Sequence, residues 1–403
     1  MRSLPPDSPA LPADALLRAA RVRGWRGRDP YDALASPLGR AVCVLGPPAR
    51  YALTQASLRL PLVRSLAAAP PLLNPKALAL FLGASARASA GETPRPGHPA
   101  LELLRLLSES QCPGGGWGYP FPWQSRYFWA PAGMMNAVVT ATVGWMACEA
   151  ADRLSVPDAG ALGRESCDQL FTRLQRTCVG SGIAISYTPG DRTRVVNISA
   201  LAARVLARAG EERAEARGLA SELTTFVLAT QRPDGSWPYA LDAGAEWEDS
   251  FHTGYILEAM IDVDRYGIEI PRDALARGFE AYRRFFDDDG AARLRPDAAS
   301  PLDAHSAAQG ILTYLRLEES RYREIAGRER AAERAAEIAR WAMANLYLPD
   351  EERFAYRIVS GRADRRNFLR WVQAWMALAL ATLAAFEAAA EGHAVHEPRR
   401  ATS

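Results

Sequence analysis

The sequence has almost no lysine and few cysteines. Lys76 is the only lysine among 403 residues, so arginine carries nearly all of the positive charge, and the sequence gives this lysine no function. The five cysteines are scattered and form no Cys-x-x-Cys pair. This spacing argues against a disulfide framework or a structural zinc ribbon and predicts a reducing, cytoplasmic location.

The chain also lacks a surplus of charge and a long apolar run. Lys and Arg number 48 against 46 Asp and Glu, so no nucleic-acid surface is expected. The Pro-rich N-terminus has no apolar signal core. The most membrane-like stretch, residues 371–386, is rich in alanine, carries Gln373 and is short for a span. We therefore expect it to be a buried core helix and expect no integral membrane segment.

What the sequence does contain is a repeated unit of two helices joined by a Gly- and aromatic-bearing turn. The clearest copy has an apolar run at 226–229, a turn at 231–239 and a helix that begins near Asp249. Related copies recur at roughly 50–70 residues, which is long enough for two helices and their connections. The second helix of each copy begins with a polar or aromatic residue: Asn136, Asn197, His252, His305 and Trp371.

Stacked two-helix units bury a continuous core, and closing the stack gives an α/α toroid. We predict an all-α toroid of about five to six helical hairpins, with an open superhelix as the alternative. Trp117, Trp237 and Tyr356 are expected at equivalent turns on one rim. The expected divisions are a disordered arm (1–14), an N-terminal helical segment with a degenerate first repeat (15–99), the toroid repeats (100–391) and a flexible tail (392–403).

Two turns carry a more specific pattern. Residues 226–227, Gln231 and 235–237 match the QW repeat of squalene and oxidosqualene cyclases, and residues 106–107, Gln111 and 115–117 match it again. Over residues 100 to 390 the chain therefore resembles the terpenoid cyclase and protein prenyltransferase superfamily. This resemblance implies a toroid and an enzyme whose central cavity binds an isoprenoid.

A second segment carries part of the same resemblance. Residues 249–253 read Asp-Ser-Phe-His-Thr and are similar to the Asp-x-(Phe/Tyr)-His-Thr segment of prenyltransferase β subunits, which implies that His252 is a zinc ligand. The Asp-x-Cys that supplies the other ligands is absent, because residues 191–194 read Asp-Arg-Thr-Arg. The Asp-x-Asp-Asp acid of class II cyclases is absent too. We therefore expect no bound metal and no cofactor.

The catalytic candidates lie at the helix starts: His252, Asp249, Tyr255 and His305. His252 follows Asp249 by three residues, so the carboxylate could orient the imidazole as a general base. Alternatively, Asp249 caps the helix and His252 is structural. His305 recurs two residues after Asp303 at the matching place in the next copy.

The ligand-binding candidates combine polar groups with aromatic rings. Arginines beside a tyrosine and an asparagine suit an anionic group, although ion pairs with Asp191 would explain the same arginines. The aromatic turn at 119–129 could be a lid, a sugar-stacking platform or a plug. The candidates are Asn136, Asn197, Arg192, Arg194, Tyr187, Tyr239, Trp123, Arg126 and Trp371.

Three functions remain open from the sequence. The first is a prenyltransferase- or cyclase-like enzyme with a central site for an anionic ligand. The second is a carbohydrate-active toroid, a uronate polysaccharide lyase or epimerase that uses Asn197, His252, Tyr255 and Arg194. The third is a non-catalytic binding toroid. Aromatic cavity walls would favour an isoprenoid as the ligand, whereas a polar groove with arginine and asparagine would favour a saccharide. The sequence leaves the oligomeric state open.

Overall fold

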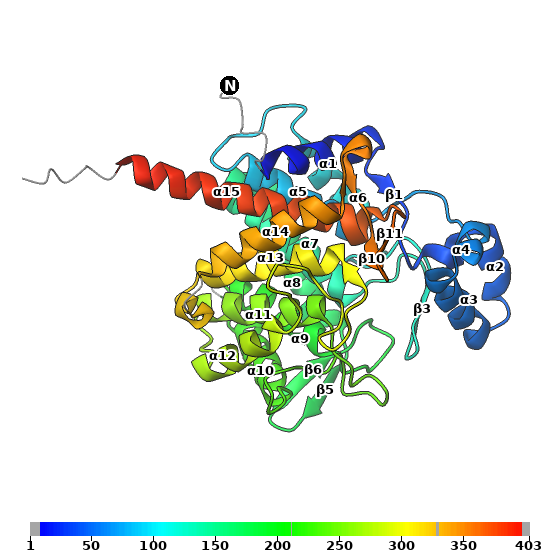
Figure 1. Cartoon of the computed structure of the whole chain (residues 1–403). Helices are drawn as coiled ribbons and strands as arrows, with labels where there is room; N and C mark the ends of the chain where they lie inside the picture. The colour runs from blue at the N-terminus through cyan, green and yellow to red at the C-terminus, as the bar shows by residue number, and fades with distance from the viewer. Residues whose placement is uncertain (1–8, 211, 328–329, 397–403) are drawn as a thin grey trace, which may run out of the picture.

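Six helices form a closed inner ring in the computed structural model, which describes residues 9–210, 212–327 and 330–396 (Figure 1). Each inner helix packs against the next one along the chain, and the last packs against the first. The inner helices are α5 (Pro75–Ala88), α7 (Ala137–Leu154), α9 (Val196–Ala209), α11 (Ser250–Arg265), α13 (Ala304–Glu318) and α15 (Ala374–His396). The predicted all-α toroid is confirmed.

An outer helix covers each inner helix, as the amphipathic pattern of the outer helices requires. The outer helices are α6 (Pro99–Glu109) on α5, α8 (Pro157–Arg173) on α7, α10 (Ala214–Ala229) on α9, α12 (Arg272–Arg283) on α11, α14 (Ala331–Asn345) on α13 and α1 (Ala10–Val22) on α15. The sixth hairpin thus joins the first helix of the described chain to the last. Helix α1 begins inside the expected arm and α15 runs past residue 392, whereas residues 1–8 and 397–403 of the expected arm and tail lie outside the described residues.

The remaining elements are short and lie in the connections. A helical excursion between α1 and α5 projects to one side of the ring (Figure 1): η1 (Asp32–Ala35), α2 (Pro37–Cys43), α3 (Pro47–Arg59) and α4 (Pro61–Leu66). Short antiparallel pairs are β1 (Arg26–Gly27) with β2 (Leu72–Leu73), β3 (Trp123–Gln124) with β4 (Trp129–Ala130), β5 (Arg176–Val179) with β6 (Gly182–Ile185), and β8 (Tyr347–Leu348) with β9 (Arg353–Phe354). A three-stranded sheet has the order β11 (Arg362–Asp364), β10 (Arg357–Val359), β7 (Leu302–Asp303). The other single turns are η2 (Arg323–Ala326), η3 (Pro349–Glu351) and the π-helix η4 (Leu369–Gln373), which leads into α15.

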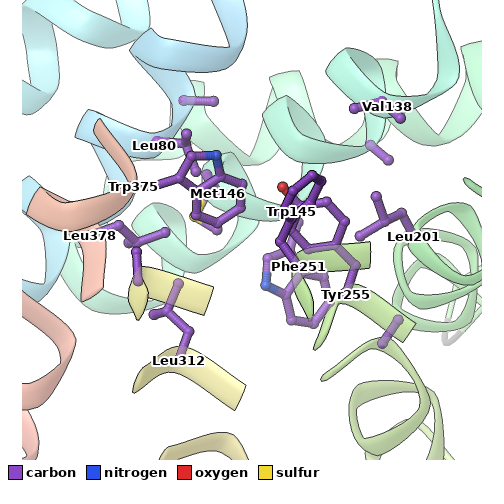
Figure 2. Packing of buried hydrophobic residues seen from close by; sticks show 14 of the residues in the cluster. Leu80, Val138, Trp145, Met146, Leu201, Phe251, Tyr255, Leu312, Trp375 and Leu378 are labelled. Carbon is purple, nitrogen blue, oxygen red and sulfur yellow. The ribbon is translucent and has the colours of Figure 1, made fainter. Parts of the chain in front are cut away.

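Aromatic and aliphatic side chains of the inner helices meet in the middle of the ring. Figure 2 shows Phe251 and Tyr255 of α11 close to Trp145 of α7, and Trp375 of α15 among aliphatic side chains and Met146. All five are at most about 5% exposed. The centre of the ring is therefore a packed core and not an open channel.

A repeated backbone hydrogen bond fixes the start of each inner helix to the turn of the next unit. The first N–H of the helix donates to a turn carbonyl: Ala137 to Tyr187 (2.9 Å), Val196 to Tyr239 (3.0 Å), Ser250 to Leu294 (3.2 Å) and Ala304 to Tyr356 (3.2 Å). Leu369 donates to Arg28 (3.1 Å) and closes the series across the chain ends. Helix α5 begins with Pro75, which has no N–H to donate. The six helix N-termini consequently lie at one end of the ring.

The turns that the sequence identified are equivalent, with one shift of register. The indole Nε1 of Trp117 donates to the carbonyl of Leu107 (2.8 Å), and that of Trp237 donates to the carbonyl of Val227 (2.9 Å), ten residues earlier in both cases. Tyr356 is instead equivalent to Tyr239, which follows Trp237 by two residues. The carbonyls of both tyrosines accept the first N–H of the inner helix of the previous unit.

Trp237→Ala is expected to lower the free energy of unfolding by about 3–5 kcal/mol, because it empties a fully enclosed site and removes the indole hydrogen bond to the Val227 carbonyl. Trp237 is 2% exposed and packs on Gly278, where a Cβ atom would lie 2.7 Å from the indole ring. Denaturant unfolding measures the loss. Trp237→Phe keeps most of the buried area and should cost less, and a loss below about 1 kcal/mol for the alanine variant would contradict this account.

Buried charges join the inner helices farther from their N-termini. Arg316 of α13 contacts Glu149 of α7 (3.1 Å) and Asp262 of α11 (3.4 Å), and Arg204 of α9 contacts Asp262 (3.5 Å) and Glu258 (3.7 Å). Arg87 of α5 also pairs with Glu149. Buried ion pairs contribute little net stability but are costly to break on one side. This network therefore holds the relative positions of five inner helices.

Glu258 makes the stability of this network depend on pH. Burial raises the pKa of Glu258 from 4.5 to about 7, so the folded state holds this proton more tightly than the unfolded chain. The contribution of Glu258 to stability is then fully present below pH 4.5 and is lost as pH rises through about 7, by about 3 kcal/mol, since one pKa unit is worth about 1.4 kcal/mol. Glu258→Gln should be more stable than wild type at pH 8 and equal to it near pH 4, as thermal unfolding would show. A variant less stable at pH 8 would contradict this.

Candidate functional site

A cavity of about 490 Å³ opens at the end of the ring where the inner helices begin. Every inner helix contributes to its lining near its N-terminus: Lys76 for α5, Val138 for α7, Asn197 for α9, His252 for α11, His305 for α13 and Trp371 in the turn before α15. The volume is that of a small-molecule site. Its position follows directly from the fixed helix starts.

The walls of the cavity are aromatic. The aromatic lining residues are Tyr31, Tyr51, Tyr119, Phe121, Trp123, Tyr127, Phe128, Tyr187, Tyr239, Trp247, Phe251, Tyr255, Tyr356 and Trp371. Tyr239 and Trp247 stack with ring centroids 4.3 Å apart, and Trp123 meets Tyr187 edge to face at 5.2 Å. Trp123 and Arg126 belong to the aromatic turn, and the guanidinium of Arg50 in α3 lies 4.0 Å from the Trp129 ring of that turn. The turn is thus part of the wall and contacts the helical excursion.

Asp249 both caps α11 and orients His252. Its Oδ1 accepts the backbone N–H of His252 (2.9 Å), and its Oδ2 lies 2.8 Å from the ring Nδ1. With the Nδ1 proton donated to the carboxylate, the Nε2 of a neutral imidazole is left as an acceptor. The two roles weighed from the sequence, cap and orienting group, are therefore compatible in one carboxylate.

His305 is the second imidazole of the lining. Its Nε2 lies 2.7 Å from the hydroxyl of Tyr255, and its Nδ1 is buried with no hydrogen-bond partner among the described residues. Burial, with the basic side chains of Lys76 and Arg370 nearby, holds the pKa of His305 well below its usual value. His305 is therefore a neutral imidazole. Phe251 lies between the two histidines, with ring centroids 4.4 Å from His252 and 4.5 Å from His305.

Asp303 repeats the capping role of Asp249 in the next helix. Its Oδ1 accepts the N–H groups of His305 (3.0 Å) and Ser306 (3.1 Å). Burial raises the pKa of Asp303 to about 6. The two caps match, but the histidines are offset by one residue, because His252 is the third residue of α11 and His305 is the second residue of α13.

One arginine of the wall, Arg370, is held by an ion pair that the sequence did not reveal. Arg370 holds Asp29 through two hydrogen bonds, one of them Nη2 to Oδ1 at 2.8 Å. Its guanidinium also lies 5.1 Å from the Tyr119 ring and 4.9 Å from the Trp371 ring. The two partners are separated by 341 residues, so no local pattern could have paired them.

Most of the predicted site residues lie in this one cavity. The catalytic candidates Asp249, His252, Tyr255 and His305 all line it. The binding candidates that line it are Asn197, Tyr187, Tyr239, Trp123, Arg126 and Trp371. The Oδ1 of Asn197 and the Nε1 of Trp371 are buried without a hydrogen-bond partner among the described residues, and both residues line the cavity.

Three predicted binding residues lie outside the lining. The Oδ1 of Asn136 accepts the N–H of Val139 (2.9 Å), so Asn136 is the cap of α7. Arg194 turns away from the cavity to Asp242 and the carbonyl of Leu241, and Arg192 is exposed. Asp191 bonds the backbone of its own turn and does not pair with these arginines. The arginines that do line the cavity are Arg59, Arg126, Arg295, Arg357 and Arg370.

Lys76 is a further lining residue to which the sequence gave no role. Its backbone N–H donates to the side chain of Asn74, the cap of α5, at 3.1 Å. It is therefore the second residue of the first inner helix, the position that His305 holds in α13. An Asn-Pro-Lys helix start after a degenerate repeat was the available signal.

Two expectations concern metals and membranes. Across the described residues no group of three or more His, Cys, Asp or Glu side chains could hold a metal ion, so the zinc-ligand role implied for His252 has no partner ligands there. One stretch in the described part of the chain, Leu369–Glu391, is long and apolar enough to cross a membrane by length and composition, and 61% of its apolar window is buried. It packs between α5 and α13, as a core helix does.

No protein-family model and no curated protein matches the sequence. Solved structures match the fold. A GH76 α-mannanase from Bacteroides thetaiotaomicron has a TM-score of 0.59 at 9% identity, with 79% of this chain and 88% of that chain covered. Cellobiose 2-epimerase from Bacillus thermoamylovorans has a TM-score of 0.58 at 10% identity, covering 76% and 87%. A D-mannose isomerase has a TM-score of 0.57 at 11% identity, covering 78% and 87%.

These matches correct the resemblance to terpenoid cyclases and prenyltransferases. The similar structures are α/α toroids named for glycoside hydrolysis, epimerisation and isomerisation. The physical reason for the mistake lies in the turns, because Trp117 and Trp237 tie each turn to the preceding helix. That bond serves a hairpin of the toroid and carries no information about the reaction in the cavity.

Proposed function

We propose that this protein is a carbohydrate-active enzyme that moves a proton at the carbon next to a sugar carbonyl, as an epimerase or isomerase. The observation that carries the proposal is the pair of imidazoles in one cavity. His252 is oriented by Asp249, and His305 lies on the other side of Phe251. Two positioned bases at one site are what removal and return of a proton require.

The lining also suits a sugar. Aromatic faces cover the C–H faces of a pyranose, while tyrosine hydroxyls, arginines and the unpaired Asn197 oxygen can bond its hydroxyl groups. Aromatic walls alone would equally suit an isoprenoid, so the walls do not decide the substrate. The acid–base pair, together with fold neighbours named as a mannanase, an epimerase and an isomerase, favours the saccharide.

In the proposed mechanism the Nε2 of His252 accepts the proton from the carbon next to the carbonyl. Asp249 stabilises the imidazolium that forms and keeps the ring in place. Arginine and tyrosine donors of the wall stabilise the negative charge that develops on the carbonyl oxygen. His305 with the Tyr255 hydroxyl, 2.7 Å apart, exchanges a proton on its own side of the site.

A hydrolase fits this site less well. Glycoside hydrolysis uses a pair of carboxyl groups, one on each side of the bond that breaks. The carboxylates in the lining are Asp249 and Asp303, and both accept backbone hydrogen bonds as helix caps. Asp249 is also engaged by His252. Asp249 is therefore fully engaged, and Asp303 alone does not make the pair of carboxyl groups that hydrolysis uses.

A uronate is the second candidate substrate, because five arginines line the cavity. An arginine can neutralise the carboxylate of a sugar acid, which makes the proton next to that carboxylate easier to remove. The same two imidazoles would then serve a lyase or a uronate epimerase.

Product analysis distinguishes these reactions. The purified protein is incubated with glucose, mannose, fructose, cellobiose and uronate oligosaccharides, and the products are separated by chromatography. We expect interconversion of a neutral sugar with its epimer or its ketose isomer. An unsaturated uronate product would favour the lyase, and release of monosaccharide by cleavage of a glycosidic bond would overturn the proposal.

A further inference from the structure

The only lysine of the chain lies in the candidate cavity. Nearly every other basic position is arginine, with Lys and Arg totalling 48, yet the head of α5 carries Lys76, which is 3% exposed and lines the cavity. A guanidinium stays protonated in proteins, whereas an amine can lose its proton and become a nucleophile. The one position that carries lysine instead of arginine therefore lies in the cavity, where an amine that can lose its proton could react with a ligand.

The surroundings of the Lys76 amine disfavour the ammonium form. Its Nζ lies 5.2 Å from the ring centroid of Tyr255 and 5.4 Å from that of Trp375, two rings that Figure 2 shows in the packed centre. Among the described residues it has no hydrogen-bond partner. The nearby carboxylate of Asp29 is held by two hydrogen bonds from Arg370 and so is not free to pair with the amine.

The charged and titratable groups near Lys76 also favour the neutral amine. Burial, followed by the positive charge of Arg370 and then a smaller effect of Arg204, holds the pKa of Lys76 well below its usual value. The charge of Asp29 opposes this only in part. His305, also near Lys76, is neutral and adds no negative charge.

We propose that Lys76 is a nucleophilic amine that forms an imine with the carbonyl carbon of the ligand in this cavity. The proposal rests on the proposed function for a substrate with a free carbonyl, an open-chain aldose or ketose. The amine nitrogen forms a bond to the carbonyl carbon, the carbonyl oxygen leaves as water with the two protons of the amine, and the imine that remains takes one proton from solvent to become an iminium. Hydrolysis by one water returns the amine and the carbonyl.

Lys76 lies close to the two histidines of the proposed proton transfer, so imine formation and proton transfer can act on the same ligand. The ring of Tyr255 lies 5.2 Å from Nζ and 5.9 Å from the His252 ring, and its hydroxyl bonds His305. Only the side chain of Tyr255 would therefore separate an iminium at Lys76 from the imidazoles of His252 and His305. Because an iminium draws electrons from the neighbouring carbon, it makes the proton there easier for an imidazole to remove.

Reductive trapping tests the proposal on the full chain. The protein is incubated at pH 7 with glycolaldehyde and cyanoborohydride, which reduces an imine to a stable secondary amine, and peptides are mapped by mass spectrometry. With one lysine, the α-amine of the chain is the internal reference. We expect Lys76 to be alkylated faster than in protein unfolded by urea, and mannose to slow the reaction. Labelling of the α-amine with none at Lys76 would overturn the proposal.

Two variants test whether the amine acts in turnover. Lys76→Arg keeps a cation in place but cannot form an imine, and Lys76→Met keeps the apolar stem; thermal unfolding shows that each is folded. Both should lower kcat by at least about a hundredfold. If Lys76 is labelled but the protein converts no sugar, the proposed function is wrong and the proposal of an imine at Lys76 still stands. Sugar conversion with full kcat in Lys76→Arg would overturn the imine and leave the proposed function.

Discussion

His252→Ala is expected to lower kcat by about a hundredfold to ten-thousandfold, which is the usual contribution of a positioned general base. The cap of α11 is kept, because it is the bond from the His252 backbone to Asp249. The side chain of His252 is mostly buried, at 21% exposed, and its loss leaves the Oδ2 of Asp249 without its ring partner, so the free energy of unfolding should fall by about 1–3 kcal/mol. Steady-state kinetics and denaturant unfolding measure the two effects separately.

His98→Ala is the matched control, because His98 also lies at a helix start but far from the cavity lining. Its Nδ1 accepts the N–H of Ala100 (3.2 Å) and caps α6. Loss of a cap costs about 0.5–2 kcal/mol, so this variant should lose stability and keep turnover. Full turnover in His252→Ala, or equal losses of activity in both variants, would contradict the role of His252 as base.

Asp29→Ala is expected to lower the free energy of unfolding by about 3–5 kcal/mol, because it leaves the guanidinium of Arg370 buried and unpaired. Asp29 and Arg370 are each 3% exposed and are joined by two hydrogen bonds. The pair connects the segment after α1 to the start of α15, so it also closes the ring. Urea unfolding followed by circular dichroism measures the loss.

Two further variants separate charge from packing. Asp29→Leu combined with Arg370→Met removes both charges and should cost less than Asp29→Ala alone, since no buried charge is left unpaired. Arg105→Ala breaks a surface pair with Glu109, whose side chains are 59% and 56% exposed, and should cost less than about 1 kcal/mol. A loss for Asp29→Ala as small as that of the surface pair would contradict the closing role of the buried pair.

The ring could be predicted because its turns carry local chemistry. Trp117 and Trp237 each bond a carbonyl ten residues earlier, so the sequence holds both partners in one short segment. The sixth hairpin of the ring, formed by α1 and α15, could not be recognised from such a local pattern. Helix α1 packs on α15 from the opposite end of the chain, and no spacing rule links the two.

The site was predictable where its contacts are local. Asp249 and His252 are three residues apart and formed the pair that the sequence proposed. Arg194 was misplaced because its partner Asp242 lies 48 residues away, and Asn136 was misplaced because its amide completes a cap. Lys76 was missed because the first repeat is degenerate, although it is the second residue of α5 as His305 is of α13.

Solvent-proton exchange tests the central claim most directly. The protein is incubated with mannose in deuterium oxide, and proton NMR follows the hydrogen on the carbon next to the carbonyl. Proton transfer by His252 predicts that wild-type protein replaces this hydrogen with deuterium, and that His252→Ala does so slower by about a hundredfold or more. Conversion of the sugar without deuterium at that carbon, or equal exchange in the variant, would contradict the account.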